Sequence, residues 1–183
     1  MTRNVREALL IIDFQNDFVP GGALPVPRGD EILARVNELI DSGRFDMIVA
    51  TRDWHPADHG SFEQQGGPWP PHCVQGSEGA ELYPGLAQEK IGVVVDAGYQ
   101  PELEGYSGFE ETDLESVLRE NEIDRVTMVG LATDYCVRHT ALDALQHGFE
   151  VVIDREGVRG IDVEPGDSER ALRELAGAGA RVS

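Results

Sequence analysis

Five short apolar runs constrain the fold of this chain more than any other feature. The first, Ala-Leu-Leu-Ile-Ile at residues 8–12, stops at Asp13, and the others occupy residues 47–51, 91–95, 126–129 and 150–154. Unbroken apolar runs of this length are typical of strands that are buried on both faces of a parallel sheet. Residues 181–183 begin in the same way and predict a sixth strand.

Segments with helical spacing separate these runs. Apolar residues recur at intervals of three and four over residues 32–40 and 114–118, and residues 135–147 and 168–176 also read as helices. Gly148 is placed to end the third of these helices. The alternation predicts right-handed βαβ units and an α/β fold, with one domain over residues 1–183 built on a doubly wound parallel sheet of about six strands flanked by helices.

Composition excludes several classes of partner. The net charge of −19 repels nucleic acid and anionic lipid, so we expect neither as a partner. Since no apolar run approaches the roughly 20 residues that span a bilayer, we expect no membrane partner and a cytoplasmic location. The two cysteines, Cys73 and Cys136, are expected to be free thiols. The sequence allows a homo-oligomer without specifying one.

Polar and small residues mark the carboxyl ends of the predicted strands, where ligands of such sheets bind. Asp13, Asp53, Ala97 and Ala132 all fall at those ends, so we expect these positions to converge. A carboxylate at the edge of a buried sheet is partly desolvated, which raises its pKa toward that of a working general base. Asp13 is therefore a candidate base, and the alternative is that it caps the loop that follows.

Asp53, His55 and His72 form a candidate metal site. Asp53 and His55 lie two residues apart and project to the same side of an extended segment, and His72 lies in a long loop over residues 54–90. Mixed carboxylate and imidazole ligands suit one divalent ion (Zn²⁺, Fe²⁺ or Mn²⁺), with Zn²⁺ favoured. His59 and Glu63 are additional candidates, either as ligands or as groups that support the ligands, and the alternative for the histidines is an ordinary surface position.

Cys136 lies where a helix is predicted to begin. The free N–H groups of a helix N-terminus lower the pKa of a thiol, and those groups and the amide of Ala132 could stabilise an oxyanion. The alternative is that Cys136 is a small buried apolar residue, which is what we expect of Cys73. Apolar and aromatic side chains in the surrounding loops could enclose a flat ring or only fix the loops: Phe18, Leu24, Trp69 and Tyr106.

Six segments occur in a fixed order that runs through nearly the whole chain: DFQNDF at residues 13–18, GGAL at 21–24, TRDWHP at 51–56, WPPHCVQG at 69–76, YSGF at 106–109 and GLATDYC at 130–136. With this set the chain resembles the nicotinamidase/pyrazinamidase branch of the isochorismatase-like cysteine hydrolases. The resemblance implies the isochorismatase-like hydrolase fold and hydrolysis of a pyridine carboxamide, nicotinamide, to nicotinate and ammonia in pyridine nucleotide salvage.

The resemblance also implies a role for each matching residue. Cys136 matches the nucleophile that forms a thioester, and Asp13 matches the residue that takes its proton and delivers it to ammonia. The candidate metal ligands match those of the ion that binds the pyridine nitrogen. A cis peptide bond is expected between Leu131 and Ala132. The substrate pocket would be lined by Phe18, Leu24, Trp69, Tyr106 and Ala132.

One position departs from the family pattern. The third catalytic residue of the family is a lysine about nine residues before YSGF, and that position is Ala97 here. The only lysine, Lys90, is seven residues earlier, or roughly 20 Å of extended chain. Three accounts stay open: an introduced lysine-to-alanine substitution, a natural variant in which Arg52 or the metal supplies the charge, and a pyridine-binding protein without turnover. A carbamoyl amidohydrolase of the same fold is a further alternative.

Overall fold

A computed structural model describes residues 4–183 and contains a six-stranded sheet. Its strands lie in the order β3-β2-β1-β4-β5-β6, and each neighbouring pair is parallel. The predicted parallel sheet is confirmed, including its sixth strand. The strands are β1 (Glu7–Ile12), β2 (Met47–Asp53), β3 (Val93–Ala97), β4 (Arg125–Leu131), β5 (Glu150–Arg159) and β6 (Arg181–Val182).

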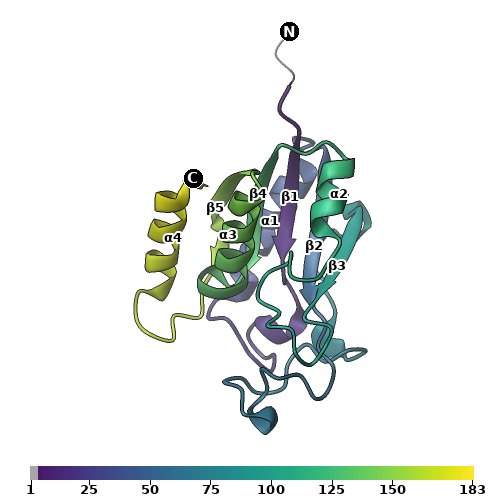
Figure 1. Cartoon of the computed structure of the whole chain (residues 1–183), viewed down its shortest axis with the longest axis vertical. Coiled ribbons are helices and arrows are strands. Elements are labelled where there is room, and N and C mark those ends of the chain that lie inside the picture. The colour runs from purple at the N-terminus through teal and green to yellow at the C-terminus, as the bar shows by residue number, and fades with distance from the viewer. Residues whose placement is uncertain (1–3) are drawn as a thin grey trace.

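Helices cover both faces of the sheet, and β1 is buried along its whole length. Ala8, Leu10 and Ile12 pack in a core with the helices α2, α3 and α4, whereas Leu9 and Ile11 pack on the other face with α1 and the loops. Figure 1 shows α3 and α4 in front of the sheet and α1 behind it. The helices are α1 (Leu33–Asp41), α2 (Leu114–Glu120), α3 (Arg138–Gln146) and α4 (Asp167–Ala178). None of the helices within residues 4–183 has the length and hydropathy that a membrane-spanning segment needs.

Several predicted boundaries differ from the structure. Strand β3 begins two residues later than predicted and reaches Ala97, and β5 runs to Arg159 beyond an irregularity in its pairing with β4. The helix predicted over residues 135–147 is divided into a π-helical turn, Thr133–Val137, and α3. This wide turn forms because the carbonyl of Ala132 accepts the N–H groups of both Tyr135 and Val137, each at 3.1 Å.

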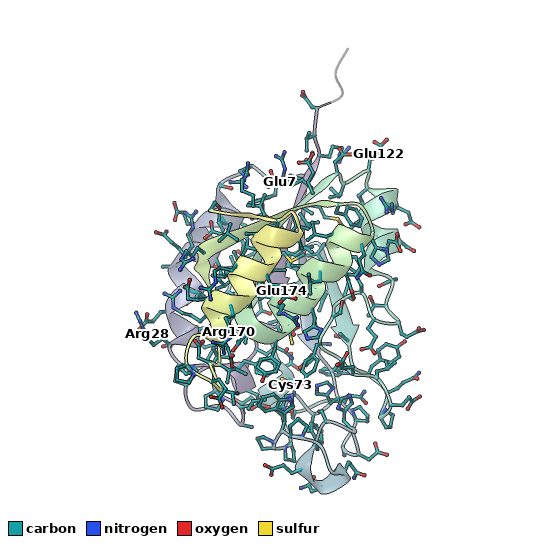
Figure 2. All side chains as sticks on the ribbon, turned by 60° about the vertical axis from the view of Figure 1, so that its left-hand side comes forward. Glu7, Arg28, Cys73, Glu122, Arg170 and Glu174 are labelled. Atoms are coloured by element: carbon teal, nitrogen blue, oxygen red, sulfur yellow. The ribbon has the colours of Figure 1, made fainter. Side chains whose placement is uncertain are left out.

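The carboxyl ends of the strands point toward the loop-rich end of the molecule (Figure 1). The long connection between β2 and β3 folds there into short 3₁₀ turns, and Cys73, which it carries, lies at this end in Figure 2. Cys73 is fully buried and packs in the core beside α1, as predicted. The strand ends and this connection together form the floor and walls of the site.

Candidate active site

Asp13 leaves the end of β1 with a left-handed backbone, at a φ of 46°, and its carboxyl group is held by Thr51 of β2. The Thr51 hydroxyl donates to Asp13 Oδ1 at 2.7 Å, and the Asp13 N–H donates to the Thr51 carbonyl at 3.1 Å. Asp13, Asp53 and Cys136 converge, with their reactive atoms within 4.8 Å of one another. Burial, reinforced by the charge of Asp53, raises the pKa of Asp13 well above its ordinary value, which suits a group that holds and passes on a proton.

Cys136 lies in the π-helical turn between β4 and α3 and is 6% exposed. The predicted lowering of its pKa is wrong. Burial, together with the charges of Asp13 and Asp53, raises the pKa of the thiol well above its ordinary value. The cost of desolvating a thiolate beside two carboxylates outweighs the lowering of the thiol pKa by a helix N-terminus. A nearby cation would be needed to bring the pKa below its ordinary value.

Ala97 ends β3 directly beside Asp53 and is buried, so the position of the family lysine faces this cluster of acidic groups. Lys90 lies elsewhere, because its ammonium group is paired with Asp41 of α1 at 2.5 Å. Among residues 4–183, the ion pairs of lysine and arginine include none with Asp13. The structure therefore places no substitute for the lysine beside the candidate base.

Arg52, the other source of charge considered for the site, is committed elsewhere. Its Nε donates to Asp96 at 2.5 Å, and its guanidinium lies 4.0 Å from the ring of Trp54. Side chains alternate along a strand, so Arg52 projects to the side of β2 opposite to that of its neighbour Asp53. Arg52 is excluded as the replacement for the lysine.

The predicted metal ligands meet in one buried trio. Asp53 Oδ2 lies 3.2 Å from His55 Nε2 and 3.7 Å from His72 Nε2. The Nδ1 atoms of the two histidines lie 2.8 Å from the carbonyls of Gly98 and Pro70, so each ring donates through Nδ1 and turns its Nε2 atom toward Asp53, where Nε2 can serve as a metal ligand once it is deprotonated.

One carboxylate oxygen of Asp53 indicates whether the trio fits a metal ion. Among residues 4–183, buried Asp53 Oδ1 has no hydrogen-bond partner, which is costly for a carboxylate oxygen unless a cation satisfies it. Burial opposes ionisation of Asp53, but the adjacent imidazoles outweigh it and lower its pKa. One ionised carboxylate and two imidazole nitrogens fit a divalent metal such as zinc and leave a coordination position open.

Gln15 positions Asp53, a contribution that sequence reasoning missed. Its Oε1 accepts the Asp53 N–H, and its Nε2 donates to the carbonyls of Asp53 and Ala80, each at 2.8 Å. Gly98 has a related role for His55, since a Cβ atom at Gly98 would lie 2.5 Å from the imidazole. Gln15 follows the candidate base by two residues, but only its fully buried position reveals this role.

His59 and Glu63, the additional candidate ligands, do not join the trio. His59 stacks on His55 with ring centroids 3.9 Å apart, and its Nδ1 is hydrogen-bonded to Ser61 at 2.7 Å. Burial and the charge of His55 lower the pKa of His59 to about 4, so this ring is neutral at physiological pH. Glu63 is exposed.

A narrow pocket opens onto both Cys136 and the metal trio, and all five predicted substrate-binding residues line it. Trp69 donates its indole N–H to the Tyr106 hydroxyl at 2.9 Å, which fixes two of the aromatic walls. Tyr135 and Ile161 were missed by sequence reasoning. Tyr135 could have been found from its place beside Cys136, whereas Ile161 lies seven residues beyond the predicted end of the fifth strand and gave no signal. The lining residues are Phe18, Leu24, Asp53, Trp69, His72, Tyr106, Ala132, Tyr135, Cys136 and Ile161.

The peptide bond between Leu131 and Ala132 is cis, as the resemblance implied. Cys73 and Cys136 are both free thiols, as predicted.

Comparisons with known proteins agree with this geometry. Residues 7–183 match the isochorismatase domain family. A nicotinamidase from Escherichia coli is 45% identical over an alignment of 198 positions that covers 96% of this chain and 93% of that protein. The crystal structure of a Pyrococcus horikoshii pyrazinamidase in complex with zinc is 52% identical, with a TM-score of 0.90 and coverage of 97% of this chain and 98% of that one. The crystal structure of PnC1 from L. infantum in complex with nicotinate is 38% identical, with a TM-score of 0.93 and coverage of 98% and 92%. The chain belongs to the isochorismatase family and is similar within it to nicotinamidases and pyrazinamidases.

Proposed function

We propose that this protein is an amidase that hydrolyses nicotinamide to nicotinate and ammonia. The observation that carries the proposal is that one aromatic pocket opens onto both the buried Cys136 and the metal-binding trio. The similarity to the E. coli nicotinamidase and to the structures with zinc and with nicotinate supports the same substrate class. Nicotinate production would serve pyridine nucleotide salvage, while a cytoplasmic location and a homo-oligomer stay predictions.

Asp53, His55 and His72 would hold the metal ion, for which zinc is favoured. A metal held by this trio would supply a Lewis acid for the pyridine nitrogen of the substrate. Trp69 and Tyr106 would enclose the ring, and their mutual hydrogen bond keeps them in place.

Cys136 and Asp13 would carry the proton and bond changes. The thiol proton passes to Asp13 as the sulfur attacks the carboxamide carbon, and Asp13 then delivers that proton to the departing amino group, which leaves as ammonia. Water attacks the resulting thioester, its proton returns to the sulfur through Asp13, and nicotinate is released. Because burial and the charges of Asp13 and Asp53 raise the pKa of the Cys136 thiol, the thiol gives up its proton reluctantly, and we expect slow turnover.

A nicotinamide-binding protein without turnover is the second candidate. Ala97 favours it, because the position that faces the acidic cluster carries no charge. Loss of one member of a catalytic unit commonly lowers the rate by orders of magnitude while the fold persists.

The experiment loads the protein with zinc and measures ammonia release from nicotinamide and, by calorimetry, nicotinate binding. Ammonia release that is abolished in Cys136→Ser and kept in Cys73→Ser supports the proposed amidase. Nicotinate binding without ammonia release supports the binding protein instead. The absence of both nicotinate binding and ammonia release would refute the proposed function.

A further inference from the structure

Ile161 forms a part of the pocket wall that no regular element holds. It lies in the loop between β5 and α4, where residues 160–162 belong to neither a helix nor a strand. Its side chain nevertheless lines the pocket together with Cys136 and packs against the core beside α1. Contacts from outside this loop must therefore fix the position of the side chain.

Asp134 makes the contacts that fix this loop. Its Oδ1 accepts the N–H of Ile161 at 2.9 Å, and its Oδ2 accepts the N–H of Asp162 at 2.8 Å. Two successive N–H groups on one carboxylate form charge-assisted bonds that fix both the position and the orientation of the peptide. Asp134 lies in the same π-helical turn as Cys136, so the wall is positioned relative to the candidate nucleophile itself.

The start of α4 holds the other side of the loop. Asp162, at a φ of 52°, accepts both the N–H and the hydroxyl of Ser168, each at 2.8 Å. Gly160 is the point of closest approach, because a Cβ atom there would lie 1.7 Å from Ser168 Oγ and 3.0 Å from Asp134 Oδ1. In Figure 2 the end of α4 near Arg170 points toward the loop-rich end of the molecule. The loop is therefore held between the turn that carries Cys136 and α4.

We propose that Asp134 is a positioning residue that sets the width of the substrate pocket, and thereby its selectivity among substituted pyridines, by holding Ile161 against it. The inference rests on the proposed function, since the ring that the pocket selects is that of nicotinamide. Asparagine at position 134 keeps one acceptor oxygen but turns an amide N–H₂ toward the other peptide N–H, so the wall is released on one side. With Ile161 less firmly held, the pocket should bind nicotinate more weakly and admit a pyridine ring that carries a methyl substituent.

The test uses zinc-loaded protein and compares the parent with Asp134→Asn, Ile161→Ala and the double variant. Calorimetry gives the Kd for nicotinate and for a set of ring-methylated nicotinates. We expect each single variant to bind nicotinate about tenfold more weakly and to shift its preference toward the same methylated ligand. Because Asp134 acts through Ile161, the double variant should bind nicotinate no more weakly than the weaker single variant.

Asp167→Asn is the matched control. The Asp167 carboxylate accepts the N–H of Glu164 in the same loop at 2.9 Å, away from the pocket. We expect this variant to bind nicotinate as the parent does. An equal loss of affinity in the control, or losses that add fully in the double variant, would overturn the positioning role.

Amide hydrogen exchange keeps this inference separate from the proposed function. The N–H groups of Ile161 and Asp162 should be protected in the parent and exchange faster in Asp134→Asn, with or without a ligand. A parent that neither binds nicotinate nor releases ammonia from nicotinamide refutes the proposed function. Exchange or nicotinate binding in Asp134→Asn that matches the parent refutes the positioning role.

Discussion

Replacing Ala97 with lysine should increase the rate of nicotinamide hydrolysis about a hundredfold. Ala97 lies beside Asp53 at the end of β3, facing three buried acidic groups that converge within 4.8 Å. Burial and the charges of Asp13 and Asp53 raise the pKa of the Cys136 thiol. An ammonium group at this position would favour the thiolate and so reverse part of that shift.

The magnitude follows from the expected change in pKa. An opposite charge within about 4–6 Å lowers the pKa of an acid by about 1–3 units, and each unit gives up to tenfold more thiolate at a pH below the pKa. The expected gain is therefore roughly 10- to 1,000-fold, and its middle value corresponds to about 3 kcal/mol of activation free energy.

The assay compares ammonia release by the parent, Ala97→Lys and Ala97→Met under identical zinc loading. Methionine is the matched control, because it adds a side chain of similar length without charge. In a Cys73→Ser background, alkylation of Cys136 by iodoacetamide reports the pKa of the thiol without turnover, and the alkylation profile should move to lower pH in the lysine variant. Equal rates in the parent and Ala97→Lys, or equal gains with methionine and lysine, would refute the reasoning.

Two further predictions concern the metal trio. Gln15→Leu removes the side-chain partners of the Asp53 N–H and carbonyl in the interior, so it should lower the free energy of unfolding in urea by about 2–5 kcal/mol. The control is Gln64→Leu at an exposed position, and a loss of stability in Gln15→Leu no larger than in this control would contradict the role assigned to Gln15. His72→Ala removes one ligand and should weaken zinc binding at least ~10-fold in a chelator competition. His139→Ala changes a histidine outside the trio and should leave the zinc affinity unchanged. Equal zinc affinities in the two variants would exclude His72 as a ligand.

Local patterns predicted the strands well, because burial on both faces requires an unbroken apolar run. Every residue of β1 is buried, and its alternate residues enter two different cores. The ends of elements were less predictable. Strand β5 continues through polar residues to Arg159, and the predicted helix at Cys136 opens with a π-helical turn, since contacts with neighbouring elements outweigh local propensity there.

The sequence named residues that converge at the candidate site, but it did not predict the hydrogen bonds that hold them in place. Asp53, His55 and His72 converge as their types and positions indicated. Gln15 and Asp134 were not predicted, because each acts by hydrogen bonds to a distant backbone segment. Such contacts leave no periodic or spacing signal in the sequence.

The sequence by itself determined the class of fold, the residues at the strand ends and the absence of a lysine where the family has one. Only the tertiary structure decided the electrostatics of those residues. The pKa of Cys136 depends on its burial and on carboxylates at the ends of two other strands, β1 and β2, so a local argument from the helix N-terminus had the wrong sign. Likewise, only the structure shows that Arg52 pairs with Asp96 and so cannot replace the family lysine. The strength of an electrostatic interaction depends on the distance between the charges in space, not along the sequence.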